Sequence, residues 1–85
     1  METVDQITKT VKAYILETFL PGENPDALTP TTPLVTGGIL DSLATLKLVS
    51  FLEEKYKMEL KAHEVDVDNL NTISQIASMV SRKIG

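Results

Sequence analysis

The sequence lacks cysteine altogether and has a single histidine, His63, among its 85 residues. Without cysteine there is no disulfide, no thiolate nucleophile and no zinc–thiolate site, and this composition fits a reducing compartment. A lone histidine with no cysteine or second histidine beside it is usually a solvated or capping side chain. The sequence therefore predicts no metal site and no thiol chemistry from the chain's own residues.

Basic residues are also scarce, because 8 Lys and Arg stand against 12 Asp and Glu, giving a formal net charge of −4. Binding to the phosphates of nucleic acid needs a basic surface, so we expect no nucleic acid partner. The apolar runs are too short to span a bilayer, and Glu2 and Asp5 lie where a secretory signal needs positive charge. We expect a soluble, cytoplasmic and monomeric protein with no membrane partner.

Aromatic residues make up only 5% of the chain and tryptophan is absent, whereas 42% of the residues are hydrophobic. The core must then be built from Leu, Ile and Val. A chain of 85 residues is too short for two ordinary domains. We therefore interpret residues 1–85 as one domain with a small core.

Two segments, residues 3–20 and 72–84, have apolar residues at every third or fourth position, which is typical of amphipathic helices. Each segment begins with Thr and has Gln three positions later, the pattern of a capping box. Their apolar faces should comprise Val4, Ile7, Val11, Ile15 and Phe19 in the first, and Ile73, Ile76, Ala77, Val80 and Ile84 in the last.

Residues 21–40 contain all four prolines and three of the four glycines, so neither a helix nor a central strand can run through them. A connection of this length in a small domain is usually functional or disordered. Apolar residues are available to fix it to the core, so we expect an ordered but irregular loop. These anchors are Leu28, Leu34, Val35, Ile39 and Leu40.

Residues 41–57 predict a second main helix with Asp41 as its N-cap. Its apolar residues cover most of the circumference, as in a helix packed against neighbours on several sides; they are Leu46, Leu48, Val49, Phe51, Leu52 and Tyr56. Only one narrow stripe is left for solvent. That stripe consists of Leu43, Lys47, Ser50 and Glu54.

Residues 63–70 offer Val65 and Leu70 to a core but are too few and too acidic for more than a turn or two of helix. Residues 66–71 are similar to a calcium loop, yet Leu70 falls where an oxygen ligand is required. The predicted fold is all-α, a small irregular four-helix bundle with three main helices, one short helix and a long first loop.

The pair Asp41-Ser42 allows three interpretations at the start of the second helix. In the first interpretation the pair is only a helix start signal of a common type. Alternatively, Ser42, His63 and Asp41 form a catalytic nucleophile, a base and a group that orients the base, although the sequence lacks the G-x-S-x-G elbow. In the third interpretation Ser42 is covalently modified, because an anion on its hydroxyl would lie at the positive end of the helix dipole.

The stretch DSLATLKLVSFLEEKY, residues 41–56, resembles the modification site and second helix of the acyl and peptidyl carrier protein family. The likeness extends from about Val4 to Ile84. It implies that Ser42 receives 4′-phosphopantetheine from coenzyme A through a separate phosphopantetheinyl transferase, with Asp41 as the N-cap beside it. The arm would carry acyl or aminoacyl groups as thioesters to downstream biosynthetic enzymes, and the chain itself would catalyse no reaction.

Two features differ from carriers that serve fatty-acid synthesis. Gly38 lies three residues before Asp41 rather than two, a form that resembles discrete, stand-alone carriers loaded by adenylate-forming ligases. Ala44 and Lys47 occupy positions where acidic residues would be typical. Recognition by partners would then depend on shape, and we predict a partner surface made of Leu43, Leu46, Lys47, Ser50 and Glu54.

The resemblance favours a specialised polyketide or nonribosomal-peptide type of pathway, with an acyl or aminoacyl ligase as the loading enzyme. Three alternatives stay open from the sequence. The chain is a housekeeping fatty-acid acyl carrier, or a D-alanyl-type carrier, or, in a different class, a cofactor-free helical interaction module.

Overall fold

A computed structural model describes residues 3–84 of the chain. Within this range the chain forms helices α1 (Val4–Phe19), α2 (Ser42–Tyr56), α3 (Val67–Leu70) and α4 (Ile73–Ile84). Two short 3₁₀ turns, η1 (Pro25–Ala27) and η2 (Ala62–Glu64), lie in the connections, and residues 3–84 include no strand. The predicted all-α bundle of three main helices and one short helix is confirmed.

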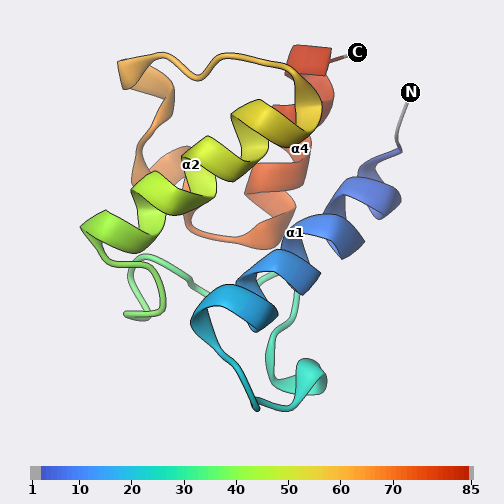
Figure 1. Ribbon diagram of the computed structural model, residues 1–85, viewed down its shortest axis with the longest axis vertical. Helices are drawn as coiled ribbons and strands as arrows, with labels where there is room; N and C mark the ends of the chain where they lie inside the picture. The colour runs from blue at the N-terminus through green and yellow to red at the C-terminus, as the bar shows by residue number, and fades with distance from the viewer. Residues whose placement is uncertain (1–2, 85) are drawn as a thin grey trace.

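Helix α4 occupies the centre of the bundle, because it contacts α1, α2 and α3 (Figure 1). Four residues of the predicted apolar face are buried, with Met79 added, and the fifth, Ile84, is partly buried and packs against the core; the four are Ile73, Ile76, Ala77 and Val80. Aliphatic side chains from α1 and α2 meet this face and complete one continuous core. The largest of these, Ile7, Ile15, Leu48 and Leu52, are fully buried.

Both predicted capping boxes form. At the start of α1 the Thr3 hydroxyl accepts the Gln6 N–H at 3.2 Å, and Gln6 Oε1 accepts the Thr3 N–H at 2.8 Å. Thr72 and Gln75 repeat this exchange at the start of α4, with both distances at 3.1 Å. Each box satisfies two N–H groups that the helix geometry leaves without a partner, which fixes where the helix begins.

The long loop between α1 and α2 is ordered and irregular, as predicted. Leu28, Leu34 and Leu40 are buried in the core, and Val35 and Ile39 pack against it. The short turn η1 was not predicted; Asn24 caps it through a hydrogen bond from the Asp26 N–H. The loop therefore has three apolar anchors along its length, which bring its end to the start of α2.

Two side chains, Val4 and Leu46, do not lie where the periodicity placed them, and Ala44 does not lie on the exposed face that the family resemblance implied. Val4 is 45% exposed because it lies in the first turn of α1, beyond the end of the core. Leu46 is 60% exposed and does not pack inside, whereas Ala44 is buried and does not belong to the exposed face. Apolar residues on nearly all sides of α2 made its faces hard to assign. Within residues 3–84 no helix has the length and apolarity needed to cross a membrane.

Candidate attachment site at the start of α2

Ser42 is the first residue of α2 and its side chain is exposed. Asp41 before it has the extended backbone of an N-cap, and its Oδ1 accepts the Ala44 N–H at 2.7 Å. The Asp41 carbonyl accepts both the N–H and the hydroxyl of Thr45, each at 2.8 Å. The backbone on both sides of Ser42 is therefore fixed while the residue itself is exposed.

The start of α2 is also suited to an anion. The first N–H groups of any helix have no acceptor within it, and here Asp41 takes only that of Ala44. The N–H groups of Ser42 and Leu43 lie at the positive end of the helix dipole. A phosphodiester on the Ser42 oxygen would therefore be placed against favourable charge.

The geometry does not support a catalytic serine. The Asp41 carboxylate is occupied as the helix cap, and His63 is an exposed residue of η2. Among residues 3–84 no hydrogen bond connects Ser42, Asp41 and His63. Without a base to take its proton and a group to orient that base, a serine hydroxyl is a weak nucleophile.

An open groove of about 560 Å³ borders Ser42. Helix α2 supplies one wall, and the segment of residues 65–70, which includes α3, supplies another. Most of the lining is aliphatic, while Asp41, Ser42, Thr45 and Asp66 contribute polar groups. The aliphatic lining residues are Val35, Leu40, Leu46, Val65, Val67 and Leu70.

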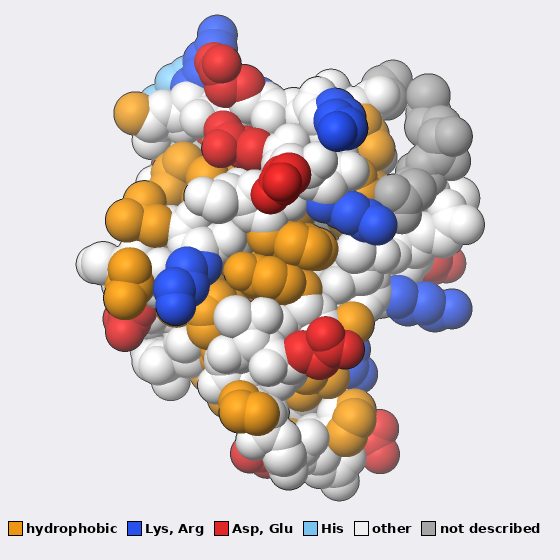
Figure 2. Space-filling view, viewed as in Figure 1, with side chains coloured by type: hydrophobic (Ala, Val, Ile, Leu, Met, Phe, Trp, Pro, Cys, Tyr) orange, Lys and Arg blue, Asp and Glu red, His pale blue; other side chains and the backbone are white. Residues whose placement is uncertain are grey.

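A second, smaller groove of about 410 Å³ lies between α2 and Tyr14 of α1. Tyr14 of α1 stacks on Phe51 with ring centroids 4.0 Å apart, and its hydroxyl donates to the Lys47 carbonyl at 3.2 Å. The predicted stripe of Leu43, Lys47, Ser50 and Glu54 is exposed, and Leu46 joins it. Figure 2 shows hydrophobic side chains along this face with acidic and basic groups interspersed.

Sequence reasoning did not identify Asn71 as a residue that shapes the groove. Its side-chain Oδ1 accepts the N–H groups of Val35 and Thr36 at 3.0 Å each, and its carbonyl accepts the Leu34 N–H at 2.6 Å. This connects the end of α3 to the long loop, 36 residues earlier in the chain. Only its position after a short helix signals such a role, and that signal is weak.

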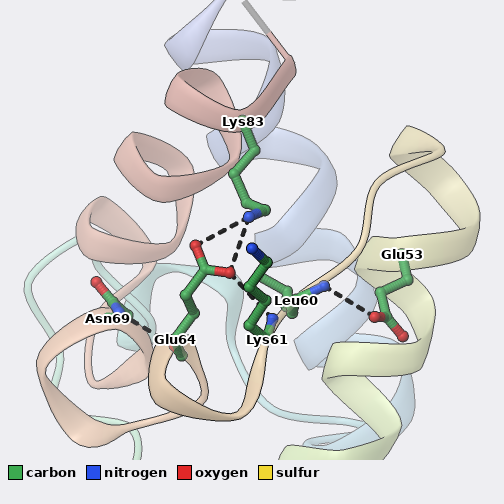
Figure 3. Close-up of polar contacts among 6 residues, drawn as sticks. All are labelled: Glu53, Leu60, Lys61, Glu64, Asn69 and Lys83. Carbon is green, nitrogen blue, oxygen red and sulfur yellow. Dashed lines mark hydrogen bonds and ion pairs between the residues drawn. The ribbon is translucent and has the colours of Figure 1, made fainter.

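Glu64 was also missed. Its carboxylate forms an ion pair with Lys83 of α4, with Nζ to oxygen distances of 2.8 and 2.9 Å, and accepts the Lys61 N–H at 3.0 Å (Figure 3). Its backbone carbonyl accepts Asn69 Nδ2 at 3.1 Å. The Lys83 hydrogen bond, followed by that of the Lys61 N–H, lowers the pKa of Glu64 below its ordinary value. Glu64 therefore connects η2, α3 and α4.

Residues 15–80 match the protein family described as "Phosphopantetheine attachment site". The match covers well over half of the chain, so the chain belongs to this family of phosphopantetheine-bearing carrier proteins. It is also similar to the probable acyl carrier protein PigG of a Serratia species. The two are 35% identical over 69 residues, which is 81% of this chain and 78% of that protein.

Family membership makes the chain a carrier and not a catalyst, with 4′-phosphopantetheine as its expected prosthetic group. Its partners therefore include a phosphopantetheinyl transferase and biosynthetic enzymes. The start of α2 fits this group chemically, because an exposed hydroxyl, a helix N-terminus and a largely aliphatic groove adjoin one another. When bound, the group supplies the thiol that the chain lacks.

Proposed function

We propose that Ser42 Oγ is the atom to which 4′-phosphopantetheine is attached, and that the chain carries an acyl or aminoacyl group as a thioester on that arm. The observation that carries this proposal is the exposure of Ser42 at a capped helix start, beside an aliphatic groove. The protein's own part is to hold the hydroxyl out to the transferase and then to present the arm to partner enzymes.

We further propose that the chain is a discrete carrier of a specialised pathway, loaded by a stand-alone adenylate-forming ligase. The position of Gly38 supports this, and so does the charge of α2. Between Asp41 and Leu60 four acidic residues are offset by three basic ones, and Lys47 is exposed in the middle of the stripe. Such a surface gives a strongly basic partner little electrostatic steering.

Attachment is tested by incubating the chain with coenzyme A and a broad-specificity phosphopantetheinyl transferase, and then recording the intact mass. We expect a gain of one arm, which Ser42→Ala abolishes. Ser74→Ala is the matched control, because Ser74 is also an exposed serine in the first turn of a capped helix. A mass that stays unchanged would favour the cofactor-free interaction module.

The cargo is tested on the modified chain with candidate adenylate-forming ligases, ATP and a panel of labelled acids. Label that is released by hydroxylamine identifies a thioester. Transfer of an amino acid or a short acid by a discrete ligase supports the specialised carrier. Exclusive transfer of long fatty acids would support the housekeeping alternative, and exclusive transfer of D-alanine would support the D-alanyl-type carrier.

A further inference from the structure

We infer that the Glu64–Lys83 ion pair is a clasp that positions one wall of the groove beside Ser42, so that Glu64 is a positioning residue for the attached arm. This inference rests on the proposed attachment at Ser42. It assigns a role to a residue that lies outside α2 and outside the predicted partner surface.

The wall in question is the segment of residues 65–70, which contributes Val65, Asp66, Val67 and Leu70 to the groove. Its only helix, α3, has four residues. A helix of that length is not stable in isolation, because nucleation costs more than its few hydrogen bonds return. The position of this wall must therefore be set by contacts at its two ends, by its buried side chain Leu70, and by Val65, which is partly buried and packs against the core.

Both ends are anchored, but to different partners. At the C-terminal end Asn71 binds the backbone of Leu34, Val35 and Thr36, and of these Val35 lines the groove. At the N-terminal end Glu64 precedes Val65 directly and binds Lys83 on the central helix α4.

The backbone of Glu64 also forms a hydrogen bond within the wall. Its carbonyl accepts Asn69 Nδ2 at 3.1 Å, which spans the first turn of α3 (Figure 3). The Asp66 carboxylate caps the same turn through the Asn69 N–H at 3.1 Å. Displacement of Glu64 therefore moves Val65 and the start of α3 together, whereas Leu70 and Asn71 hold the other end. The wall would pivot and change the width of the groove.

The clasp is accessible enough to open while the protein stays folded. The side chains of Glu64 and Lys83 are 21% and 22% exposed, and both lie outside the core. Ion pairs of this exposure contribute modestly, so we expect their loss to raise local opening of the wall by about two- to fivefold. Global unfolding requires the aliphatic core to open, and the clasp does not form part of it.

The test compares Glu64→Gln and Lys83→Met with wild type by amide hydrogen exchange, first without the arm and then with it attached. We expect amides of residues 65–70 to exchange about two- to fivefold faster in both variants, with α1 and α4 unchanged. The charge-swapped double variant, Glu64→Lys with Lys83→Glu, should recover slower exchange. Glu59→Gln is the matched control, because Glu59 is exposed and has no bonded partner within residues 3–84.

A second readout addresses positioning. The arm is attached as its butyryl thioester from butyryl-coenzyme A, and methyl NMR signals of Val65, Val67 and Leu70 are compared before and after loading. We expect loading to shift these signals in wild type, and to shift them by at most half as much in Glu64→Gln. Unchanged exchange in the variants overturns the clasp. Faster exchange with equal loading shifts overturns its role toward the arm.

These outcomes are separate from failure of the proposed function. If Ser42 does not accept the arm, the intact mass reveals it, and the exchange measurement without the arm still decides whether Glu64 holds the wall. If Ser42 is modified and the variants behave like wild type, only the inference about the clasp fails.

Discussion

Asp41 Oδ1 lies 2.7 Å from the backbone nitrogen of Ala44, so the residue that precedes Ser42 caps the helix on which Ser42 stands. The capping carboxylate and the proposed attachment hydroxyl belong to adjacent residues but have separate roles. Asp41 fixes the backbone, and Ser42 beside it is exposed for the proposed modification. Because the two roles are separate, the contribution of Asp41 to stability can be measured on the chain without the prosthetic group.

Replacement of Asp41 should lower stability through loss of the cap. We expect Asp41→Ala to reduce the free energy of unfolding by about 1 kcal/mol, and Asp41→Asn to retain most of the stability because an amide oxygen also caps. Urea unfolding of the unmodified chain measures both. Equal stability of Asp41→Ala and wild type would show that the hydrogen bond to Ala44 contributes nothing.

Gly37 has a steric role in the loop that leads to Ser42. A Cβ atom at this position would clash with the backbone carbonyl oxygen of Pro33, so the backbone would have to move. We expect Gly37→Ala to destabilise the chain by about 1–3 kcal/mol.

The neighbouring Gly38 provides the comparison for this loop. It has open space but a φ of +83°, so Gly38→Ala should cost only the strain of the left-handed conformation, about 1 kcal/mol. Thermal or urea unfolding of both variants compares the loss of stability caused by the steric clash at Gly37 with the loss caused by backbone strain at Gly38. A Gly38→Ala penalty larger than that of Gly37→Ala would contradict the packing argument.

Glu64 should give the stability an acid-side pH dependence. Hydrogen bonds from Lys83 and from the Lys61 N–H hold its pKa in the folded state below the ordinary value of 4.5. A carboxylate with a lowered folded pKa stabilises the protein above its unfolded pKa, and this contribution is lost as pH falls through the folded value. The stability difference between wild type and Glu64→Gln should therefore be present at pH 7 and vanish in acid.

Urea titrations of wild type and Glu64→Gln at a series of pH values measure that difference. Glu59→Gln serves again as the comparison, since it removes an exposed carboxylate that has no bonded partner within residues 3–84. A difference that grows toward acid pH would have the wrong sign for this account of Glu64.

Leu43 and Leu46 should matter for partners and not for folding. They are 63% and 60% exposed, far more than a core leucine. We expect Leu43→Ser and Leu46→Ser each to change the free energy of unfolding by no more than about 0.5 kcal/mol. At the same time each should lower kcat/KM for modification by the transferase about tenfold, as loss of an apolar interface anchor does.

Val4→Ser is the control for these two variants, because Val4 is also an exposed aliphatic residue but lies at the start of α1. Transferase kinetics of the three variants, together with their unfolding curves, separate the effects. Equal kcat/KM for the three variants would show that Leu43 and Leu46 do not contribute to transferase recognition.

Local patterns predicted the helices well, because both the capping boxes and the apolar periodicity are properties of neighbouring residues. Thr3 and Gln6, or Thr72 and Gln75, are close in sequence, so their hydrogen bonds can be anticipated. The same patterns could not place Leu46, since an apolar residue at helical spacing suits a core or a partner surface equally well.

Contacts between distant segments escaped prediction for a different reason. Glu64 and Lys83 are 19 residues apart, and Val35 and Asn71 are 36 apart. Charged and amide side chains have many possible partners along a chain, and only the tertiary fold selects one. The prediction that Ser42 is the attachment site rests on a local motif. The residues that form the other wall of its groove come from a distant segment, so no local motif indicates them.

The attachment of the arm to Ser42 is tested most directly by locating it within a peptide. Trypsin cleavage after Lys12 and Lys47 gives residues 13–47, in which Ser42 is the only serine. After treatment with coenzyme A and the transferase, fragmentation of this peptide should place one phosphopantetheine on Ser42. An arm found on a threonine, on another peptide or on none would contradict the account.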